Sequence, residues 1–349
     1  LDVLKEAFKE QTIGICEHAK QNGVFKKYNR ILIQDSTTIS LPAWLSWCFP
    51  GNVSKGKKKA QLKIQVIYDL LNNQFVHFEI TPYTDNDQSK SKDILEIANE
   101  DDLVLRDLGY FALECFDEMN QKQIHCLSRL KYGVTVFDAE TEKEMDLLQT
   151  LKKDNGIDKW VWVGKVKKVK LRLIAIPLSQ EQTNLRRMKA KNDRDKRLKH
   201  KNEYYEMLGY SLFITTEDQS VFSTTQIAQV YGFRWRIENI FKCWKGQFHL
   251  QKLIPQDRSI TKERVEAIIY MMLIFVVLFQ VTVYNYILMR ANRIKDYLIS
   301  LCKLCKYIAN NIILFFEQSL NDLAPQILYH CRYDKRLDRK NFIQKLILS

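Results

Sequence analysis

Three acidic side chains in this sequence have the type and the setting of metal ligands. Asp35 and Asp107 each end a short apolar run, over residues 30–35 and 103–107, and Glu238 lies in a helix-forming segment. Ligands of open α/β sheets bind beyond the carboxyl ends of strands, so neighbouring strands would bring both aspartates together. Carboxylates at close range repel one another, and a divalent cation such as Mg²⁺ removes that conflict. Two such ions can activate a nucleophile and stabilise the leaving oxygen of a phosphodiester. The alternative is that the acids are unrelated, because single strand-end acids are common.

The segment around Glu238 carries further residue types that suit a nucleic-acid site. Ser223 and Gln226 have the spacing of a capping box, which predicts a helix from Ser223 to about Phe248. At about 100° per residue, one stripe roughly 60° wide on this helix holds an aromatic, a guanidinium, a carboxylate and an ammonium group. These residues are Tyr231, Arg234, Glu238 and Lys245. The alternative is a solvated face, because Glu238 and Lys242 would pair as i,i+4 neighbours in any helix.

Strands alternate with helices in the first part of the chain, which predicts an α/β sheet. Strands are expected at residues 30–35, 60–68, 74–80, 103–107 and 123–130, and helices at 1–22, 88–99 and 111–121. Asn72 and Asn73 favour a hairpin turn between the second and third strands. After Tyr132 the chain is β-rich and looks like an insertion, with runs at 134–137, 160–166, 171–176 and 210–215. Helices return after Ser223 and are clearest at 301–316 and 341–348.

The motif around Glu238 resembles the signature of a known enzyme family. The spacing Tyr-x2-Arg-x3-Glu-x6-Lys, which marks one branch of the DDE transposases of bacterial insertion sequences, is matched in full by Tyr231, Arg234, Glu238 and Lys245. Two further stretches resemble the aspartate motifs of that family: Asp35-Ser36-Thr37 and Asp107-Leu108-Gly109-Tyr110-Phe111. The resemblance covers about residues 30 to 290.

The resemblance implies roles for individual residues. Asp35, Asp107 and Glu238 would be the metal-binding catalytic triad. The residues that would contact DNA near the cleaved strand are Tyr231, Arg234 and Lys245. Lys63 matches a lysine often seen at that place in relatives and is a further DNA-binding candidate.

The same resemblance implies a fold and an order of segments. A ribonuclease-H-like catalytic core would be interrupted by a β-rich insertion and followed by a helical C-terminal region. An N-terminal helical segment is expected at 1–29. The core is expected in two parts, at 30–132 and 221–290, with the insertion at 133–220 between them. The C-terminal helices are expected at 291–349. Relatives that form hairpin-ended DNA hold a flipped base on a tryptophan of the insertion. Trp160 and Trp162 are candidates for that role, with core packing as the alternative for at least one. Little precedes Asp35, where family members often carry a DNA-recognition domain, so recognition of an end sequence is expected to be incomplete in this stretch.

The expected activity is cut-and-paste transposition of double-stranded DNA by two-metal phosphodiester transfer. Two Mg²⁺ ions would serve as cofactors, and Mn²⁺ can substitute for them. The partners would be the element ends and the target DNA, bound by a homodimer. Two alternatives remain: a ribonuclease-H-like nuclease that only hydrolyses DNA, and an inactive or domesticated derivative that only binds it.

The composition favours a polyanionic partner. The 349 residues include 54 Lys and Arg against 41 Asp and Glu, a net charge of +13, and basic groups on a phosphate backbone release condensed counterions. Basic residues gather at 55–59 and 186–201, although solvated faces also carry such runs. No signal peptide opens the chain, which favours a cytoplasmic, nucleoid-associated protein. Residues 267–288 are long and apolar enough for a membrane span, but Gln280 within them favours a buried helix of a soluble core.

The eight cysteines do not have the spacing of a secreted disulfide domain, so reduced thiols are expected. Cys302 and Cys305, with His330 and Cys331, raise the possibility of a zinc site. Cysteines on an apolar helix face are the more common explanation of such a pair.

Overall fold

The computed structural model describes residues 25–54, 56–193, 201–255, 257, 259–288 and 299–332. The chain forms two compact units, Leu1–Asn86 with Phe233–Ser349 and Asp87–Gly232. These limits differ from the expected segment boundaries at 132 and 220, which stay a prediction. The helices expected at 1–22 and 341–348 lie outside the described residues.

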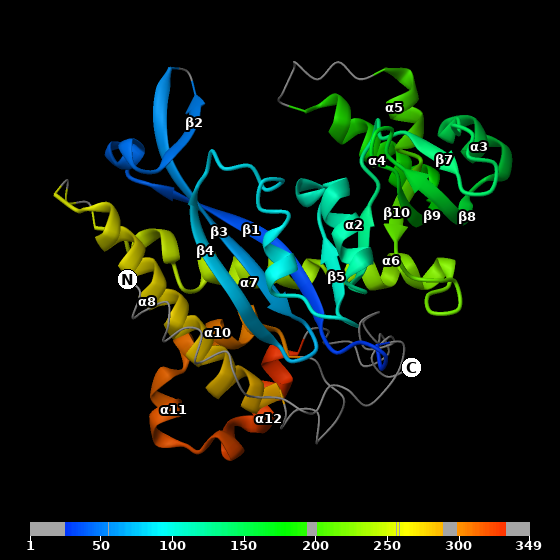
Figure 1. Ribbon diagram of the computed structural model, residues 1–349. Helices are drawn as coiled ribbons and strands as arrows, with labels where there is room; N and C mark the ends of the chain where they lie inside the picture. Colours follow the sequence, from blue (N-terminus) through cyan, green and yellow to red (C-terminus); the bar gives the residue numbers. More distant parts are fainter. Residues whose placement is uncertain are drawn as a thin grey trace. The chain divides into compact units, whose positions relative to one another are not determined.

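Antiparallel strands form the sheet of the first unit (Figure 1). Its strands and a short helix are β1 (Ile31–Leu41), η1 (Ala43–Trp47), β2 (Pro50–Ser54), β3 (Lys57–Asp69) and β4 (Gln74–Pro82). β3 pairs antiparallel with β1, β2 and β4. Asn73, in the left-handed region with φ 58°, lies in the turn between β3 and β4. The predicted hairpin is therefore confirmed.

β1 is longer than the sequence pattern predicted. It continues past Asp35 through a Ser-Thr-Thr stretch to Leu41 and stays paired with β3. Threonine is β-branched and suits an extended strand, so the polar run does not form a loop. Asp35 lies within β1, opposite Val66 of β3. The prediction that Asp35 ends its strand is wrong.

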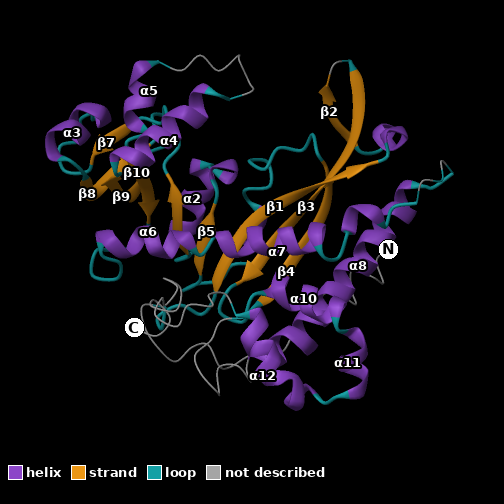
Figure 2. Cartoon of the chain, turned by 180° about the vertical axis from the view of Figure 1, so that it is seen from behind, coloured by secondary structure: helices purple, strands orange, loops and turns teal. Residues whose placement is uncertain are grey.

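Helices cover the sheet of the first unit. They are α7 (Trp235–Gly246), η4 (Leu250–Lys252), α8 (Lys262–Leu278), the π-helix η5 (Phe279–Tyr284), α10 (Leu301–Asn310), α11 (Ile312–Glu317) and α12 (Leu320–Cys331). α7 runs across the strands in Figure 2, and it packs against β1 and α10. Trp244 of α7 is fully buried against Phe75 and Phe78 of β4, with ring centroids 5.5 and 5.6 Å apart. This aromatic cluster anchors α7 on the sheet.

The apolar segment at 267–288 belongs to one helix, Lys262–Leu288, which comprises α8, η5 and a last turn. In the described part of the chain it is the one helix long and apolar enough to cross a membrane, and a single such helix is weak evidence for a span. Its Gln280 is buried and donates hydrogen bonds to the Tyr68 hydroxyl (3.2 Å) and the Asn73 carbonyl (2.8 Å). These contacts pack the helix on the β3–β4 hairpin, but only 39% of its apolar window is buried, so the expected core helix stays a prediction.

The second unit has its own run of strands. Its elements are η2 (Asp93–Glu96), β5 (Leu103–Arg106), η3 (Leu108–Tyr110), α2 (Leu113–Gln121), β6 (His125–Arg129), β7 (Val136–Asp138), α3 (Leu147–Asp154), β8 (Ile157–Val163), β9 (Val169–Pro177), α4 (Gln180–Lys191), α5 (Asn202–Met207), β10 (Tyr210–Thr215) and α6 (Thr224–Gly232). Their spatial order is β5-β6-β10-β9-β8-β7. β5 and β6 are parallel, and the other pairs are antiparallel. β10 therefore joins the strands of the β-rich segment to β6, and both groups share one sheet.

Most strand and helix predictions in this unit are confirmed to within a few residues, but the helix at 88–99 is wrong. Only the short η2 forms there. The buried Arg106 side chain donates to the Ser91 carbonyl (2.8 Å) and to its hydroxyl (2.5 Å). The Ser91 hydroxyl in turn donates to the Tyr110 carbonyl (2.9 Å). Such side-chain bonds compete with a helical backbone, so tertiary contacts override the local pattern.

A buried ion pair fixes the start of α6 in the second unit. Arg172 of β9 is 2% exposed and binds the Asp158 carboxylate of β8 through two nitrogens, at 2.6 and 2.7 Å. It also donates to the carbonyl of Phe222 (2.7 Å), just before α6, and Thr224 of α6 donates to the same Asp158. The segment leading into α6 is thus held by the β8–β9 strands.

Candidate active site

Asp35 and Glu238 are brought together by one guanidinium. Arg234 Nη1 lies 3.0 Å from Asp35 Oδ2, and Arg234 Nη2 lies 2.9 Å from Glu238 Oε1. Asp35 comes from β1, and Glu238 from the first turn of α7, which packs on that strand. The site therefore depends on a contact between segments about 200 residues apart in the chain.

The three charged side chains are largely shielded from water. Their exposed fractions are 10% for Arg234, 16% for Asp35 and 31% for Glu238. The second oxygen of Asp35 accepts a hydrogen bond from the Ser36 backbone N–H at 2.8 Å. Two carboxylates this close would repel one another without a cation between them, and the guanidinium supplies that charge.

The paired carboxylates fit a hard divalent cation. Carboxylate oxygens are the ligands that Mg²⁺ prefers, and this ion commonly takes only one or two of them while keeping its waters. Among the described residues, no group of three or more His, Cys, Asp or Glu side chains is placed to hold a metal ion. Asp35 and Glu238 are a pair, and a third ligand would have to come from elsewhere.

Asp107 has the position that the sequence pattern predicted. It follows β5 directly, is half-buried, and precedes η3, whose Tyr110 N–H bonds to the Asp107 carbonyl (3.1 Å). It belongs to the second unit, whereas Asp35 and Glu238 belong to the first. The convergence of all three acids remains a prediction.

The helix expected from 223 to 248 is broken. α6 ends at Gly232 and α7 begins at Trp235, with Phe233 and Arg234 in a turn. Glycine is a poor helix former, which explains why the break falls there. Tyr231 lies in α6, where it is buried with its ring 5.3 Å from that of Phe213. The prediction that Tyr231 shares one helical stripe with Lys245 is therefore wrong. Only Arg234, Glu238 and Lys245 keep the predicted helical spacing, at the start of α7 and along it.

The two candidate lysines differ in their surroundings. Lys245, in the last turn of α7, is half-buried, and this burial lowers the pKa of its ammonium group. Lys63 of β3 is buried, and its Nζ donates to the carbonyl of Asp85 at 2.8 Å, with the Tyr83 ring 5.4 Å away. Lys63 thus ties β3 to the loop after β4, a structural role that the sequence pattern did not indicate.

Comparison with known proteins identifies the family. The family model for the transposase DDE domain matches residues 27–278 of the chain. The chain belongs to the DDE transposase family. The expectation of a bacterial insertion-sequence DDE transposase is confirmed at this level.

The similar proteins are themselves transposases of bacterial insertion sequences. The transposase for insertion sequence element IS231D of Bacillus thuringiensis subsp. finitimus is 30% identical over 292 residues, which cover 78% of this chain and 60% of that protein. The transposase for insertion sequence element IS1151 of Clostridium perfringens is 25% identical over 278 residues, covering 74% and 58%. The chain thus spans about 60% of the length of these relatives. A cryo-EM structure of the piggyBac transposase synaptic complex with hairpin DNA matches 90% of this chain at 8% identity, but its TM-score of 0.45 is too low to establish a shared fold.

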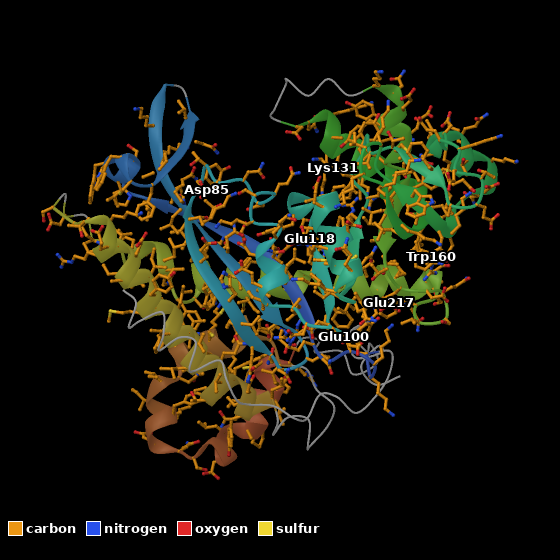
Figure 3. The ribbon with its side chains drawn as sticks, viewed as in Figure 1. Asp85, Glu100, Glu118, Lys131, Trp160 and Glu217 are labelled. Atoms are coloured by element: carbon orange, nitrogen blue, oxygen red, sulfur yellow. The ribbon has the colours of Figure 1, made fainter. Side chains whose placement is uncertain are left out.

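Two tryptophans of this DDE transposase lie on β8, in the predicted insertion. Trp160 and Trp162 are two residues apart, so they face the same side of the strand. Both are half-buried, and the indole N–H of Trp160 donates a hydrogen bond to the carboxylate of Asp218. Trp160 is labelled in Figure 3. Neither is fully buried in the core, and a role in holding a flipped base stays a prediction.

The basic segments are described in part. Lys58 and Lys59 at the start of β3 are exposed, whereas Arg186 and Arg187 of α4 donate to backbone carbonyls of the same unit. Residue 55 and residues 194–200 lie outside the described part of the chain. The two arginines therefore act in packing, and an electrostatic groove along 186–201 stays a prediction.

The zinc possibility finds no support. The described part of the chain holds no group of three or more His, Cys, Asp or Glu side chains placed to bind a metal ion, and His330 stacks on Tyr307 with ring centroids 5.5 Å apart. Cys302 and Cys305 lie on α10, and Cys305 is buried. The alternative of cysteines on a helix face fits these contacts.

Proposed function

We propose that this chain is the catalytic part of a bacterial insertion-sequence transposase that cuts DNA at the element ends and joins it to target DNA. The observation that carries the proposal is the pairing of Asp35 and Glu238 by Arg234. Both acids belong to the triad that the resemblance implies, and one guanidinium contacts both although they are far apart in sequence. Membership of that family supports the reaction class.

Asp35, Asp107 and Glu238 would hold the divalent metal in this proposal. Bound there, two Mg²⁺ ions (or Mn²⁺ in their place) would lower the pKa of the attacking water or hydroxyl and stabilise the leaving oxygen of the phosphodiester. The oxygen-only donor set and the shielding of Asp35 and Glu238 support this assignment. A ribonuclease-H-like core with a β-rich insertion is the fold that we propose for this site.

Arg234 would have two successive partners. In the protein alone its guanidinium neutralises Asp35 and Glu238, and it is only 10% exposed. A guanidinium binds phosphate in the same two-pronged way as it binds carboxylates. When Asp35 and Glu238 bind metal ions, Arg234 would be released to bind a DNA phosphate. The ion pair and the predicted DNA contact would then be two successive states of the same side chain. Tyr231, Lys245 and Lys63 are the further DNA contacts that we propose.

The partners follow from the chemistry. The substrates would be double-stranded element ends and target DNA, and two ends must be held together for joining, which calls for a dimer. The net charge of +13 supports a polyanionic partner. A cytoplasmic, nucleoid-associated protein is the corresponding location.

The test is strand cleavage and joining by the purified chain on linear DNA that carries the sequence flanking its own reading frame. With Mg²⁺ we expect nicking at the frame's flanks and joined products, both lost with EDTA. Asp107→Asn should reduce the cleavage rate by more than about 100-fold. Loss of a residue that only hydrogen-bonds to a metal ligand would have a smaller effect, of about 10- to 100-fold. DNA binding should stay within a few-fold of the unaltered chain.

The outcomes separate the alternatives. Cleavage without joined products would indicate a nuclease that only hydrolyses DNA. Binding without cleavage in the unaltered chain would indicate a DNA-binding derivative. Full cleavage by the Asp107→Asn variant would remove Asp107 from the site.

A further inference from the structure

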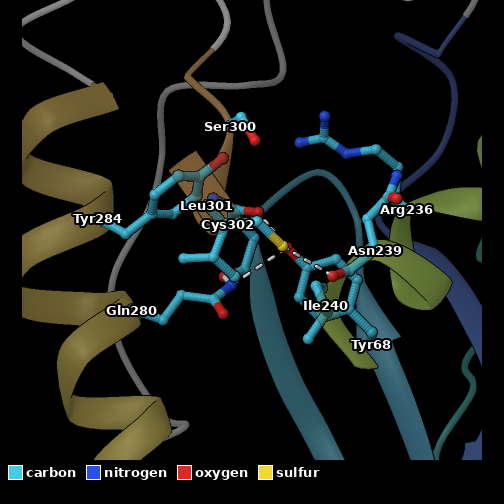
Figure 4. Close-up of a pocket in the computed structure, with 10 residues that line it drawn as sticks. Tyr68, Arg236, Asn239, Ile240, Gln280, Tyr284, Ser300, Leu301 and Cys302 are labelled. Carbon is cyan, nitrogen blue, oxygen red and sulfur yellow. Dashed lines mark hydrogen bonds between the residues drawn. The ribbon is translucent and has the colours of Figure 1, made fainter. Parts of the chain in front are cut away.

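Three thiols meet where α7 packs against α10. The sulfur of Cys243 in α7 lies 3.5 Å from that of Cys305 in α10, and Cys243 also shares a hydrogen bond with Cys302. Cys302 and Cys305 are three residues apart, so they lie on the same face of α10. The Cys302 thiol further donates to the carbonyl of Asn239, one turn before Cys243, at 3.4 Å (Figure 4). The sulfurs are in contact without being bonded, since a disulfide is about 2.0 Å long.

The three thiols differ in access. Cys243 and Cys305 are buried, whereas Cys302 is half-exposed. Cys302 also lines a cavity of about 110 Å³ with Tyr68, Arg236 and Gln280 (Figure 4). Cys302 is therefore the most accessible of the three thiols.

The three thiols also differ in acidity. The hydrogen bond with Cys243 lowers the pKa of Cys302 to about 7, with a further contribution from Lys242, and together these outweigh burial. The hydrogen bonds of Cys243 to Cys302 and Cys305, together with burial, raise the pKa of Cys243. Because the thiolate is the reactive form, Cys302 is the nucleophile of the cluster.

We propose that Cys302 is a modification site for low-molecular-weight disulfides and that Cys243 resolves the adduct into a disulfide linking α7 to α10. The Cys302 thiolate attacks one sulfur of the small disulfide, whose S–S bond breaks and releases one thiolate. Cys243 then gives its proton to the released thiolate and attacks the Cys302 sulfur, so the protein disulfide forms, the bond from Cys302 to the small-molecule sulfur breaks, and the second thiolate leaves. Two protein thiols are oxidised and one small disulfide is reduced to two thiols.

The site does not depend on the proposed function. Its chemistry needs only the three thiols and an oxidant of the disulfide class. Cys243 lies five residues after Glu238 on α7, so the proposed disulfide would tie the helix that carries Glu238 to α10.

The test uses the full chain, reduced and freed of reductant, treated at neutral pH with oxidised glutathione and then with N-ethylmaleimide. Peptide mass spectrometry should find Cys243 linked to α10 and no glutathione left on Cys302. Cys48 is the matched control within the same molecule, since it is half-exposed but burial raises the pKa of its thiol. It should be modified at least about tenfold more slowly than Cys302 at pH 7.

Two variants assign the order of events. Cys243→Ser should keep glutathione on Cys302, because the resolving thiol is gone, and Cys302→Ser should form neither adduct nor link. In the unaltered chain, the alkylation rate of Cys302 should rise with increasing pH, with a midpoint near pH 7. This measurement requires no variant. A stable glutathione adduct on Cys302 of the unaltered chain, or alkylation of Cys302 no faster than that of Cys48, would overturn the proposal.

Discussion

The guanidinium of Arg234 lies 3.0 Å from the carboxylate of Asp35, although 199 residues separate them. The same group reaches Glu238, one helical turn further along its own segment, at 2.9 Å. Arg234 is therefore the cation of the metal-free site. Its removal should have consequences that a plain surface arginine does not share.

Arg234→Gln should destabilise the metal-free protein by about 2 kcal/mol, because two shielded carboxylates lose the charged hydrogen-bond donor between them. Mg²⁺ should stabilise this variant more than the unaltered chain, since no guanidinium has to be displaced. Urea unfolding with EDTA and with Mg²⁺ measures both effects. Arg264→Gln, at an exposed position of α8, is the control and should change neither. An equal Mg²⁺ response in Arg234→Gln and the unaltered chain would argue against a shared place for guanidinium and metal.

Glu238→Gln should abolish Mg²⁺-dependent cleavage while the fold is kept. The amide oxygen can still accept the hydrogen bond from Arg234, but the charge that would bind the metal is gone. Cleavage of flanking DNA and circular dichroism are the two measurements. Glu263→Gln, exposed at the start of α8, is the control and should cleave normally. If Glu238→Gln cleaves as well as its control, Glu238 is not a metal ligand.

Trp244→Ala should cost about 3–5 kcal/mol of unfolding free energy, as large aromatic truncations in a core do. Its ring fills the space between α7 and Phe75 and Phe78 of β4, so the helix that carries Glu238 loses its anchor. Thermal and urea unfolding give the change in stability. Trp47→Ala is the matched control, because that side chain is 70% exposed, and it should shift stability little. Similar losses in both variants would contradict the anchoring role of Trp244.

The Asp158–Arg172 pair predicts a pH dependence of stability. Burial tends to raise the pKa of Asp158, but the hydrogen bonds from Arg172 and Thr224 outweigh it, and the pKa lies below the usual value. A carboxyl with a lowered folded pKa stabilises the protein above its unfolded pKa of about 4, and that contribution is lost as the pH falls through the folded value. Asp158→Asn should therefore cost about 1–3 kcal/mol at pH 7 and less near pH 3, where the contribution has begun to be lost.

Urea unfolding of the unaltered chain and of Asp158→Asn at the two pH values measures this difference. Asp154→Asn, at the exposed end of α3, serves as the control. A stability gap for Asp158→Asn that stays constant between pH 7 and pH 3 would show that the charge of Asp158 is not the cause.

Local signals in the sequence predicted the regular elements well. The two asparagines at 72–73 predicted the β3–β4 hairpin, and the run at 210–215 predicted β10 at its observed limits. These elements depend on turn chemistry and side-chain patterns that are short in range. Asp107 was predicted directly after its strand for the same reason.

The errors arose where distant contacts decide the structure. Residues 88–99 form no regular helix because the carbonyl and hydroxyl of Ser91 are hydrogen-bonded to Arg106 and Tyr110 instead. β1 continues past Asp35 because its threonines pair with β3. The i,i+4 spacing of Arg234 and Glu238 would have indicated their ion pair, but no local signal gives the contact of Arg234 with Asp35. The cysteine cluster was missed because Cys243 stands about 60 residues before its partners.

The position of β10 bears on how the β-rich segment is held in its unit. β10 is hydrogen-bonded to β6 on one side and to β9 on the other, so no seam separates the segment from the strands that precede it. Removing β7 to β9 would leave β10 as a bare edge, and exposed strand edges pair with other chains. The β-rich segment is therefore continuous with the sheet of its unit, and a shortened chain without β7 to β9 would need that edge covered.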